Sequence, residues 1–322
     1  MNQGLPYYNK FTEKYPKVTD LAAAPEGEVL SLWQGLGYYS RARNLLKTAQ
    51  IVCNEHWGIF PKSFDGLIQL KGIGRYTAAA IASFAYNEKV AVVDGNVLRV
   101  LARYFGISDP VDTEKAKNQF FEIANELIPG SDPATHNQAI MELGALVCLP
   151  KNAKCAECPL SETCVALSEK KVDLLPIKGK KKAVKDRYFQ YFVYLYNGTV
   201  GLQKREKSDI WQNLYDFPHV ESGPFEKNGL SPEPFAGLPF HNISEKYKHI
   251  LTHQRIFVVF CQVSLDDVNI KNCIESELGL LFVPFEEVDK VAKPILIKNY
   301  LDKEILSLTF PIHVKQLKLW QV

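Results

Sequence analysis

Four cysteines near the middle of the chain have a spacing that suits metal coordination. Cys148, Cys155, Cys158 and Cys164 follow the pattern C-x6-C-x2-C-x5-C, which places four thiols within 17 residues. Structural zinc sites and [4Fe–4S] clusters both accept four thiolate ligands. The spacing therefore predicts a metal site and leaves the choice between zinc and iron open.

The other cysteines, Cys53, Cys261 and Cys273, stand alone, and we interpret them as small packing residues. The first residues lack the basic and then apolar order of a signal peptide. No apolar run approaches the roughly 18 residues that are needed to cross a bilayer. We therefore expect a cytoplasmic protein with no membrane partner, and we expect no disulfide framework.

An aspartate stands where an apolar run meets a predicted helix, in the stretch VVDGNVLRVLARYFG, residues 92–106. Asp before an apolar-periodic segment is a common N-terminal helix cap, and Gly106 marks the expected end of the helix. Taken alone, the stretch favours a structural role for Asp94. It leaves open whether the carboxylate also does chemistry.

A second motif, LKGIGRYTAAA at residues 70–80, places Gly72 and Gly74 between two predicted helices. Two glycines one residue apart permit a tight turn whose N–H groups point outward at a helix start, which suits a phosphate oxygen. Lys71 and Arg75 add positive charge and favour nucleic-acid binding. A turn of this kind is also often a plain connector, and the net charge of +2 does not by itself indicate a nucleic-acid partner.

The elements that must position these residues differ between the two halves of the chain. With 322 residues, 46% of them hydrophobic and 23% charged, the chain suits two soluble domains. Apolar residues at three- and four-residue spacing predict helices at 19–33, 40–57, 75–86 and 112–128. Short runs rich in aromatic and β-branched residues predict strands at 188–196, 199–205 and 255–265.

The two halves are joined by a basic linker, residues 171–187. Its stretch LPIKGKKKAVKDR has six Lys or Arg residues against one Asp and no apolar periodicity. This pattern is typical of a solvated linker, or of a linker that also follows phosphates. The predicted fold class is α+β, with an all-α domain at 1–170 and a sheet-containing domain at 188–322.

The order of these motifs resembles the helix-hairpin-helix DNA glycosylases of the endonuclease III superfamily. LKGIGRYTA, VDGNVLRV and the cysteine run follow one another as they do in that superfamily. LWQGLGYYSRARNL and the sheet-rich second half are similar to adenine DNA glycosylases of the MutY type. The resemblance covers nearly the whole chain. It implies an all-α helix-hairpin-helix glycosylase domain with a [4Fe–4S] cluster loop, followed by an α/β Nudix-like lesion-recognition domain.

The resemblance also implies roles for residues of the first half. Asp94 is then catalytic, with Asn96 of the same VDGN motif beside it, and a helix N-terminus suits an anion that stabilises a cationic sugar. Tyr76 stands where lyase-type members carry a Schiff-base lysine, which implies a monofunctional glycosylase; a packed aromatic is the alternative. Gln138 falls where the family contacts the extruded adenine, although an exposed helical Gln needs no function.

The implied partner is double-stranded DNA that contains an adenine mismatch, bound by a monomer. The residues implied in DNA binding are Lys71, Gly72, Gly74, Arg75, Thr77 and Tyr38, of which Tyr38 matches the family's aromatic wedge. Leu36 is assigned to lesion recognition. The family's Phe-Ser-His loop that inspects 8-oxoguanine is matched by Leu251, Thr252 and His253. The acidic helix of a Nudix hydrolase is not matched, so nucleotide hydrolysis is not expected.

We therefore expect a base-excision repair enzyme that hydrolyses the N-glycosidic bond of adenine mispaired with 8-oxoguanine or guanine. The family's general acid, a Glu on an early helix, is expected upstream of QGLPYYNKF at residues 3–11, and no Glu of this chain takes its place by motif. We interpret the chain as truncated at its N-terminus. A non-catalytic mismatch-binding protein and an endonuclease III-type lyase remain the alternatives.

Overall fold

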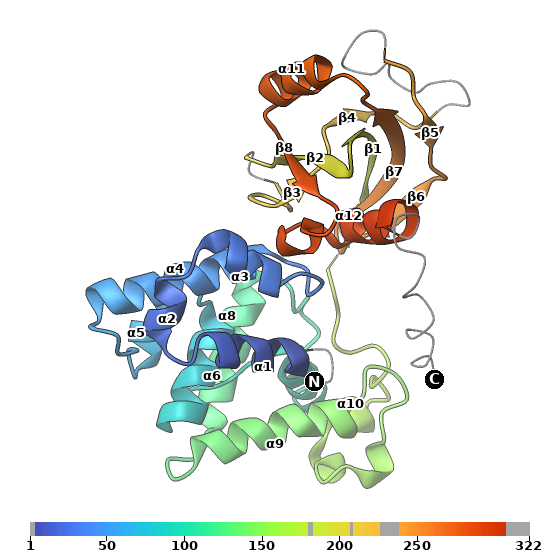
Figure 1. Ribbon diagram of the computed structural model, residues 1–322. Coiled ribbons are helices and arrows are strands. Elements are labelled where there is room, and N and C mark those ends of the chain that lie inside the picture. The colour runs from blue at the N-terminus through green and yellow to red at the C-terminus, as the bar shows by residue number, and fades with distance from the viewer. Residues whose placement is uncertain (1–3, 180–182, 207–208, 226–237, 307–322) are drawn as a thin grey trace. The chain divides into compact units, whose positions relative to one another are not determined.

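The computed structural model describes residues 4–179, 183–206, 209–225 and 238–306 (Figure 1). The chain forms two compact units, which we call the sheet unit, residues 1–46 and 182–322, and the helical unit, residues 47–181. Helix α4, Ser40–Glu55, crosses the division between them. Lys180–Lys182 of the basic linker lie outside the described residues, so the interpretation of that stretch is untested.

The helical unit contains the elements that follow α4. Its helices are α5 (Phe64–Ile68), α6 (Arg75–Tyr86), α7 (Gly95–Tyr104), α8 (Glu114–Leu127), α9 (Pro133–Leu146) and α10 (Val165–Ser168), with 3-10 turns at Cys155–Glu157 and Ser161–Thr163. The helix predicted at 75–86 is confirmed, and α8 lies within the one predicted at 112–128. Apolar faces of α7 and α8 share a core around the fully buried Phe120.

An extended segment leads from α6 to α7 and carries the chain to Asp94. It forms no strand pair, so its backbone groups need other partners. The buried amide of Asn137 supplies them on both sides, because it accepts from Val92 N at 2.9 Å and donates to Val90 O at 2.9 Å. Asn125 accepts from Ala91 N at 2.8 Å. Two side-chain amides therefore fix the approach to Asp94.

The sheet unit begins with short helices α1 (Leu5–Lys14), α2 (Val18–Ala22) and α3 (Glu26–Leu32). The helix predicted at 19–33 is split because Pro25 adopts an extended conformation and caps α3. After the linker come β1 (Lys185–Tyr196), β2 (Thr199–Lys204), β3 (Tyr215–Asp216), β4 (His219–Ser222), β5 (Asn242–Ile243), β6 (Tyr247–Ile250), β7 (Gln254–Ser264), α11 (Val268–Leu278), β8 (Leu280–Pro284), a 3-10 turn (Val288–Lys290), α12 (Ile295–Tyr300) and a π-helical turn (Leu301–Leu306).

The strands form one mixed sheet in the order β3-β2-β1-β7-β5, with β4 paired to β1, β6 to β7 and β8 to β2. The long central pair β1 and β7 is parallel, from Lys185 opposite Gln254 to Leu195 opposite Ser264. The other pairs are antiparallel. The predicted α+β class is confirmed.

Both faces of the sheet are covered. Successive side chains of β1 point to opposite faces, and apolar residues occupy both sets of positions. Phe189 and Tyr191 face a core shared with α12, whereas Phe192 and Tyr194 face a second core shared with α11 (Figure 1). The first core also includes residues of α3 and α4, among them the fully buried Leu30. The N-terminal helices of the sheet unit are therefore part of its packing.

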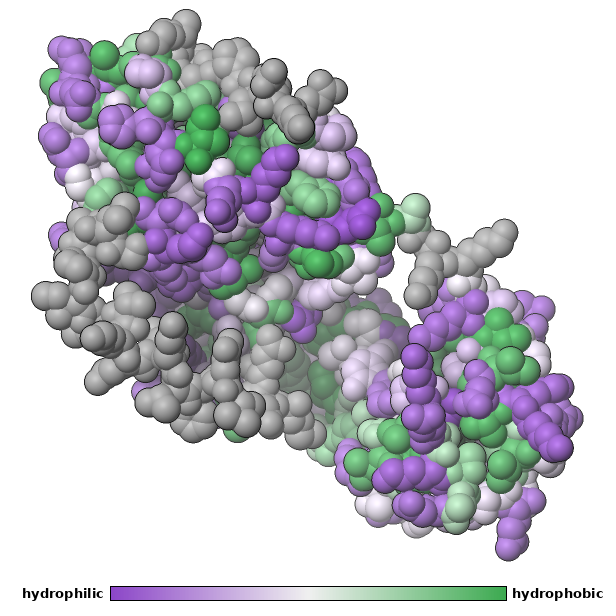
Figure 2. Space-filling model, turned by 90° about the vertical axis from the view of Figure 1, so that its right-hand side faces the viewer, coloured by the Kyte–Doolittle hydropathy of each residue, from purple (hydrophilic) through white to green (hydrophobic). Residues whose placement is uncertain are grey.

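No helix in the described part of the chain is long and apolar enough to span a bilayer. On the face that Figure 2 shows, hydrophilic and hydrophobic residues are interspersed.

Candidate functional sites

Asp94 caps α7 with both carboxylate oxygens hydrogen-bonded. Its Oδ1 accepts from the backbone N–H groups of Asn96 and Val97, both at 2.8 Å, and its Oδ2 accepts from the Asn96 side-chain amide at 2.9 Å. The predicted cap is confirmed. Three N–H donors therefore fix the position of this carboxylate at the start of α7.

The carboxylate lines a cavity of about 570 Å³, which we call the helical cavity. Tyr76 and Arg75 from the start of α6 and Glu114 from α8 share its lining. Tyr76 is 46% exposed, and no hydrogen bond joins it to Asp94 among the described residues. Gln138 does not line this cavity; it is exposed on α9 and donates to Glu142 at 2.6 Å.

Glu114 is the second carboxylate of the helical cavity. Lys117 donates to it at 2.6 Å, and this hydrogen bond lowers the pKa of Glu114 below its usual value. A carboxylate with a lowered pKa is a poor proton donor at neutral pH. Glu114 therefore adds negative charge to the cavity and does not act as an acid.

The glycine turn before α6 has the backbone conformation that its sequence requires. Gly72 has a φ of +84°, which a side chain would strain, and Gly74 caps α6 beside open space. Lys71 and Thr77 are exposed. The guanidinium of Arg75 is instead turned to α8, where it donates to Asn118 at 2.7 Å and lies 5.1 Å above the Phe121 ring.

Helix α7 connects the helical cavity to the cysteine loop. Asn96 accepts from Arg99 at 2.9 Å, and Arg99 also donates to the carbonyl of Cys148 at 2.7 Å. Helix α9 approaches closely here, because a Cβ on Gly144 would lie 2.7 Å from Asn96 Cβ. Arg103, one turn further along α7, donates to the Cys148 sulfur at 3.3 Å.

The four predicted ligand cysteines line a single, mainly apolar cavity together with Arg103. Burial raises the pKa of the Cys155 thiol, and the other three thiols raise it further, which shows that the four are grouped. No three His, Cys, Asp or Glu side chains of the described part of the chain are arranged to hold a metal ion. The grouping is therefore a thiol-lined cavity. Of the lone cysteines, Cys261 is buried as predicted, but Cys273 is exposed and its packing role was wrongly predicted.

The sheet unit has a cavity of its own, about 490 Å³, which we call the sheet cavity. It brings together the two predicted lesion-recognition segments, because Leu36 and Tyr38 line it from one side and Thr252 and His253 from another. The Tyr38 hydroxyl is hydrogen-bonded to Thr252 Oγ1. Tyr38 has a left-handed φ of +49° and follows Gly37 at +69°. This turn aims the Tyr38 side chain at the loop that contains Thr252.

A third segment, residues 209–211, completes the sheet cavity. The nearly buried Trp211 ring lies 5.9 Å from the ring of His249, and burial lowers the pKa of His249, which keeps it neutral. Arg43 from α4 donates to the carbonyl of Gln212 at 2.9 Å and holds this segment in place.

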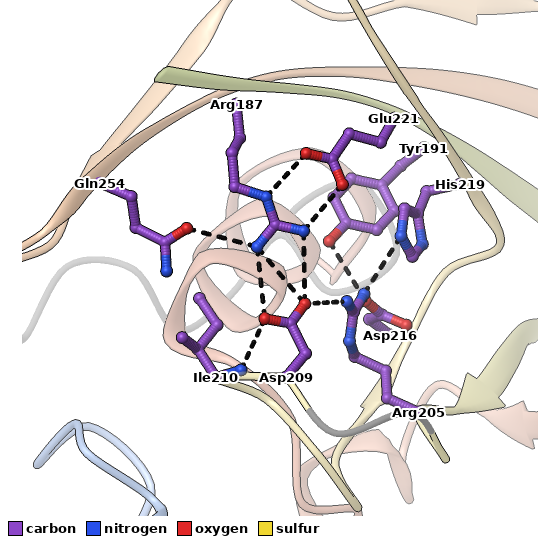
Figure 3. Close-up of polar contacts among 9 residues, drawn as sticks. All are labelled: Arg187, Tyr191, Arg205, Asp209, Ile210, Asp216, His219, Glu221 and Gln254. Carbon is purple, nitrogen blue, oxygen red and sulfur yellow. Dashed lines mark hydrogen bonds and ion pairs between the residues drawn. The ribbon is translucent and has the colours of Figure 1, made fainter. Parts of the chain in front are cut away.

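A chain of ionic contacts joins the sheet cavity to the interior of the sheet unit (Figure 3). Arg187 forms two hydrogen bonds of 2.8 Å with Glu221 and further ones with Asp209. Arg205 contacts Asp209 at 2.7 Å and the fully buried Asp216 at 2.6 Å. Two guanidinium groups are therefore shared among three carboxylates.

The environment of these groups shifts their protonation. Hydrogen bonds with Glu221 raise the pKa of Arg187 above its usual value. Burial raises the pKa of Asp216 to about 6 in spite of its contact with Arg205. Burial lowers the pKa of His219, whose Nε2 lies 3.3 Å from Arg205, to about 4. His219 is therefore neutral at pH 7.

Comparison with known proteins identifies both parts of the chain. The HhH-GPD superfamily of base excision DNA repair proteins matches residues 2–126, and the NUDIX domain family matches residues 190–303. An adenine DNA glycosylase of Buchnera aphidicola subsp. Schizaphis graminum is 37% identical over 261 residues, which cover 81% of this chain and 75% of that protein. The chain belongs to the adenine DNA glycosylase family.

The chain spans less than two thirds of the length of some family members that it matches. The chain covers 63% of the adenine DNA glycosylase of Buchnera aphidicola subsp. Acyrthosiphon pisum, at 37% identity, and 61% of the mouse protein, at 34% identity. Among solved structures, a thermostable thymine-DNA glycosylase matches 52% of this chain and 76% of its own at 30% identity, with a TM-score of 0.48.

For this adenine DNA glycosylase family member, sequence reasoning missed most of the sheet cavity. Asp209, Trp211, His249 and Gln254 line it, and Arg187 supports it, but each looks ordinary in the sequence. The stretch WQNLYDFPH, residues 211–219, lies within the predicted second domain, and no role was predicted for it. Arg187 was assigned to the basic linker at 171–187, but it lies on β1 (Lys185–Tyr196), which begins before the strand predicted at 188–196. A charge on a partly buried strand needs a partner, so the missed strand boundary hid the signal.

Proposed function

We propose that this protein removes adenine mispaired with 8-oxoguanine or guanine from duplex DNA by hydrolysing its N-glycosidic bond. The observation that carries the proposal is the geometry of Asp94, an acceptor-only carboxylate that is fixed by three N–H donors and faces a cavity of about 570 Å³. The family's name and the helix-hairpin-helix match support it. An extruded base needs such a recess next to the reacting carbon.

In this mechanism the C1′–N9 bond breaks and its electron pair leaves with the adenine. Positive charge develops on the sugar, and the fixed carboxylate of Asp94 stabilises it. Asn96 holds that carboxylate by donating to Oδ2, so it acts through Asp94. A water molecule then adds its oxygen to C1′ and loses one proton, while the departing adenine takes up one proton, so the net reaction is hydrolysis.

The proposed reaction is monofunctional. Tyr76 lines the helical cavity, and a phenol does not form a Schiff base with the sugar. The product is an abasic site with an intact strand. Borohydride should trap no covalent adduct with the protein, and an adduct through a lysine would instead support a lyase.

We also propose that Cys148, Cys155, Cys158 and Cys164 hold a [4Fe–4S] cluster. Four thiols that line one mainly apolar cavity match the donor set of this group, and the N–H of Arg103 near Cys148 suits a thiolate. Binding would draw the four sulfurs closer together around the cluster. The cluster would tie the loop after α9 to α7. Purified protein should be brown and contain about four iron and four sulfide ions per chain; colourless protein with one zinc would overturn this assignment.

The proposed partner is mismatched duplex DNA, bound by a monomer, and the proposed location in a bacterium is the nucleoid. Lys71, Thr77 and the N–H groups around Gly74 are exposed and suit phosphate contacts. Arg75 joins them if it leaves Asn118. We propose that Gln138 contacts the extruded adenine after the same kind of rearrangement, since it now donates to Glu142.

Single-turnover assays on a duplex with adenine opposite 8-oxoguanine test the proposal. Asp94→Asn keeps a good helix cap and removes the negative charge, so the rate should fall on the order of 10²–10³-fold with little change in DNA affinity. Lesion binding without any base release by the parent chain would overturn the enzymatic proposal and leave a lesion-binding protein.

A further inference from the structure

Arg187 does not line the sheet cavity, but it contacts Asp209 and Gln254, which do. Its guanidinium donates to Asp209 at 3.3 and 3.4 Å and to Oε1 of Gln254 at 3.3 Å (Figure 3). Gln254 starts β7 directly after the loop that contains Thr252. One side chain therefore links the loop before Trp211 to the loop after Thr252.

The position of Arg187 is itself fixed. It is 13% exposed, and both of its hydrogen bonds to Glu221 of β4 are 2.8 Å long. Its contact with the Phe189 ring, at 4.6 Å, adds packing. A planar guanidinium held in this way presents its remaining N–H group in one direction only.

This contact decides how the Gln254 amide is oriented. Because Oε1 accepts from Arg187, the amide nitrogen points away from it, as Figure 3 shows. Among the described residues that nitrogen has no hydrogen-bond partner. Two other polar groups of the sheet cavity already have partners, since Asp209 is held by arginines and Thr252 by Tyr38. Gln254 offers the cavity a free N–H donor.

A donor in this place can distinguish an oxidised guanine from a normal one. 8-Oxoguanine carries a carbonyl oxygen at C8, where guanine carries a C–H group that accepts no hydrogen bond. We propose that Gln254 determines specificity by donating its amide N–H to this carbonyl oxygen, and that Arg187 is the positioning residue that orients the amide. The inference rests on the proposed function and on the expectation that the loop at residues 251–253 inspects 8-oxoguanine.

The test measures equilibrium binding of the full chain to two duplexes. Each carries a non-hydrolysable adenine analogue, opposite 8-oxoguanine in one and guanine in the other. Gln254→Met should reduce the preference for 8-oxoguanine about ten-fold, the upper end for one hydrogen bond, while binding to the guanine duplex changes less than about two-fold. Gln262→Met is the matched control, because Gln262 lies on the same strand but donates to Tyr300 at 2.9 Å, outside the cavity.

Arg187→Lys tests the positioning role. Lysine keeps the positive charge but lacks the planar guanidinium with its several N–H donors, so the preference for 8-oxoguanine should fall several-fold. The double variant Arg187→Lys with Gln254→Met should lose no more of this preference than Gln254→Met alone. A merely structural Arg187 would instead weaken binding to both duplexes and add to the loss in the double variant, which would overturn its role.

The possible results separate this inference from the proposed function. A parent chain with no preference for 8-oxoguanine overturns both. A parent with the preference, together with a Gln254→Met variant that keeps it, overturns the role of Gln254 alone. Equal losses on both duplexes, or the same loss in Gln262→Met, also overturn it.

Discussion

Polar groups are held in position differently in the helical cavity and in the sheet cavity. Asp94 is held by its own helix, because its hydrogen-bond partners Asn96 and Val97 follow it by two and three residues. The sheet cavity is assembled from segments around residues 36, 210 and 252, and its support comes from buried ion pairs. A local motif suffices for the first arrangement, whereas the second depends on the complete fold.

This difference predicts different sensitivities. A helix cap keeps its geometry when its charge is removed, because Asn caps nearly as well as Asp. A buried ionic network loses its geometry when one member is removed, because the remaining charges are left without partners. The helical cavity should therefore tolerate conservative changes structurally, and the sheet cavity should not.

The largest effect on stability should come from Arg205→Met in the sheet unit. The change leaves Asp216, which is 1% exposed, without its cation, and breaking a buried pair typically costs about 3–5 kcal/mol. Urea unfolding followed by circular dichroism measures the change. Adding Asp216→Asn should recover part of the loss.

Glu287→Gln is the matched control for that change, because Glu287 pairs with Lys290 in the same unit and both are more than half exposed. Its effect should stay below about 1 kcal/mol. Comparable losses of unfolding free energy in Arg205→Met and Glu287→Gln would show that the buried ion pairs stabilise the sheet unit no more than an exposed pair does.

Gly144→Ala probes the close contact of α7 and α9 in the helical unit. The added Cβ would lie 2.9 Å from the carbonyl oxygen of Asn96, and this backbone atom cannot move aside easily. We therefore expect a loss of about 1–3 kcal/mol in the free energy of unfolding and slower base release. Gly27→Ala in α3 meets nothing within 4 Å and should be neutral or slightly stabilising. A stable, fully active Gly144→Ala would refute the close contact.

A further prediction concerns pH. His219 has a pKa of about 4 in the fold against 6.5 unfolded, so its contribution to stability is present above pH 6.5 and is lost as pH falls towards 4. Asp216, with its raised pKa, acts in the opposite direction. The stability difference between the parent and His219→Gln should therefore shrink below pH 6.5, by at most about 1.4 kcal/mol per pH unit. A difference that does not vary with pH would mean that His219 titrates normally.

Several elements of both units follow from local sequence signals. Helix α6 begins after Gly74 and ends at Tyr86, as its apolar spacing predicts, and β1 and β7 contain the predicted aromatic runs. Asp94 is recognised as a cap because the signal lies within a few residues. The grouping of the cysteines likewise follows from their short spacing.

The composition of the sheet cavity could not be predicted in this way. Tyr38 and Thr252 are 214 positions apart, and their contact depends on how α4 packs against the sheet. The polar partners of Arg187 come from three separate segments, and no local pattern encodes such a set. The assignment of residues 1–46 to the sheet unit could not be predicted for the same reason, because it depends on the packing of α3 into the core of that unit.

The most direct test of the account measures cleavage rate and lesion preference together for Asp94→Asn and Thr252→Ala. Asp94→Asn should lower the single-turnover rate on the order of 10²–10³-fold and keep the preference for 8-oxoguanine over guanine. Thr252→Ala should lower that preference by about 1–3 kcal/mol and leave the rate on saturated complex nearly unchanged. If Asp94→Asn abolishes the preference, or Thr252→Ala slows base release as strongly as Asp94→Asn does, chemistry and recognition are not divided between the two cavities.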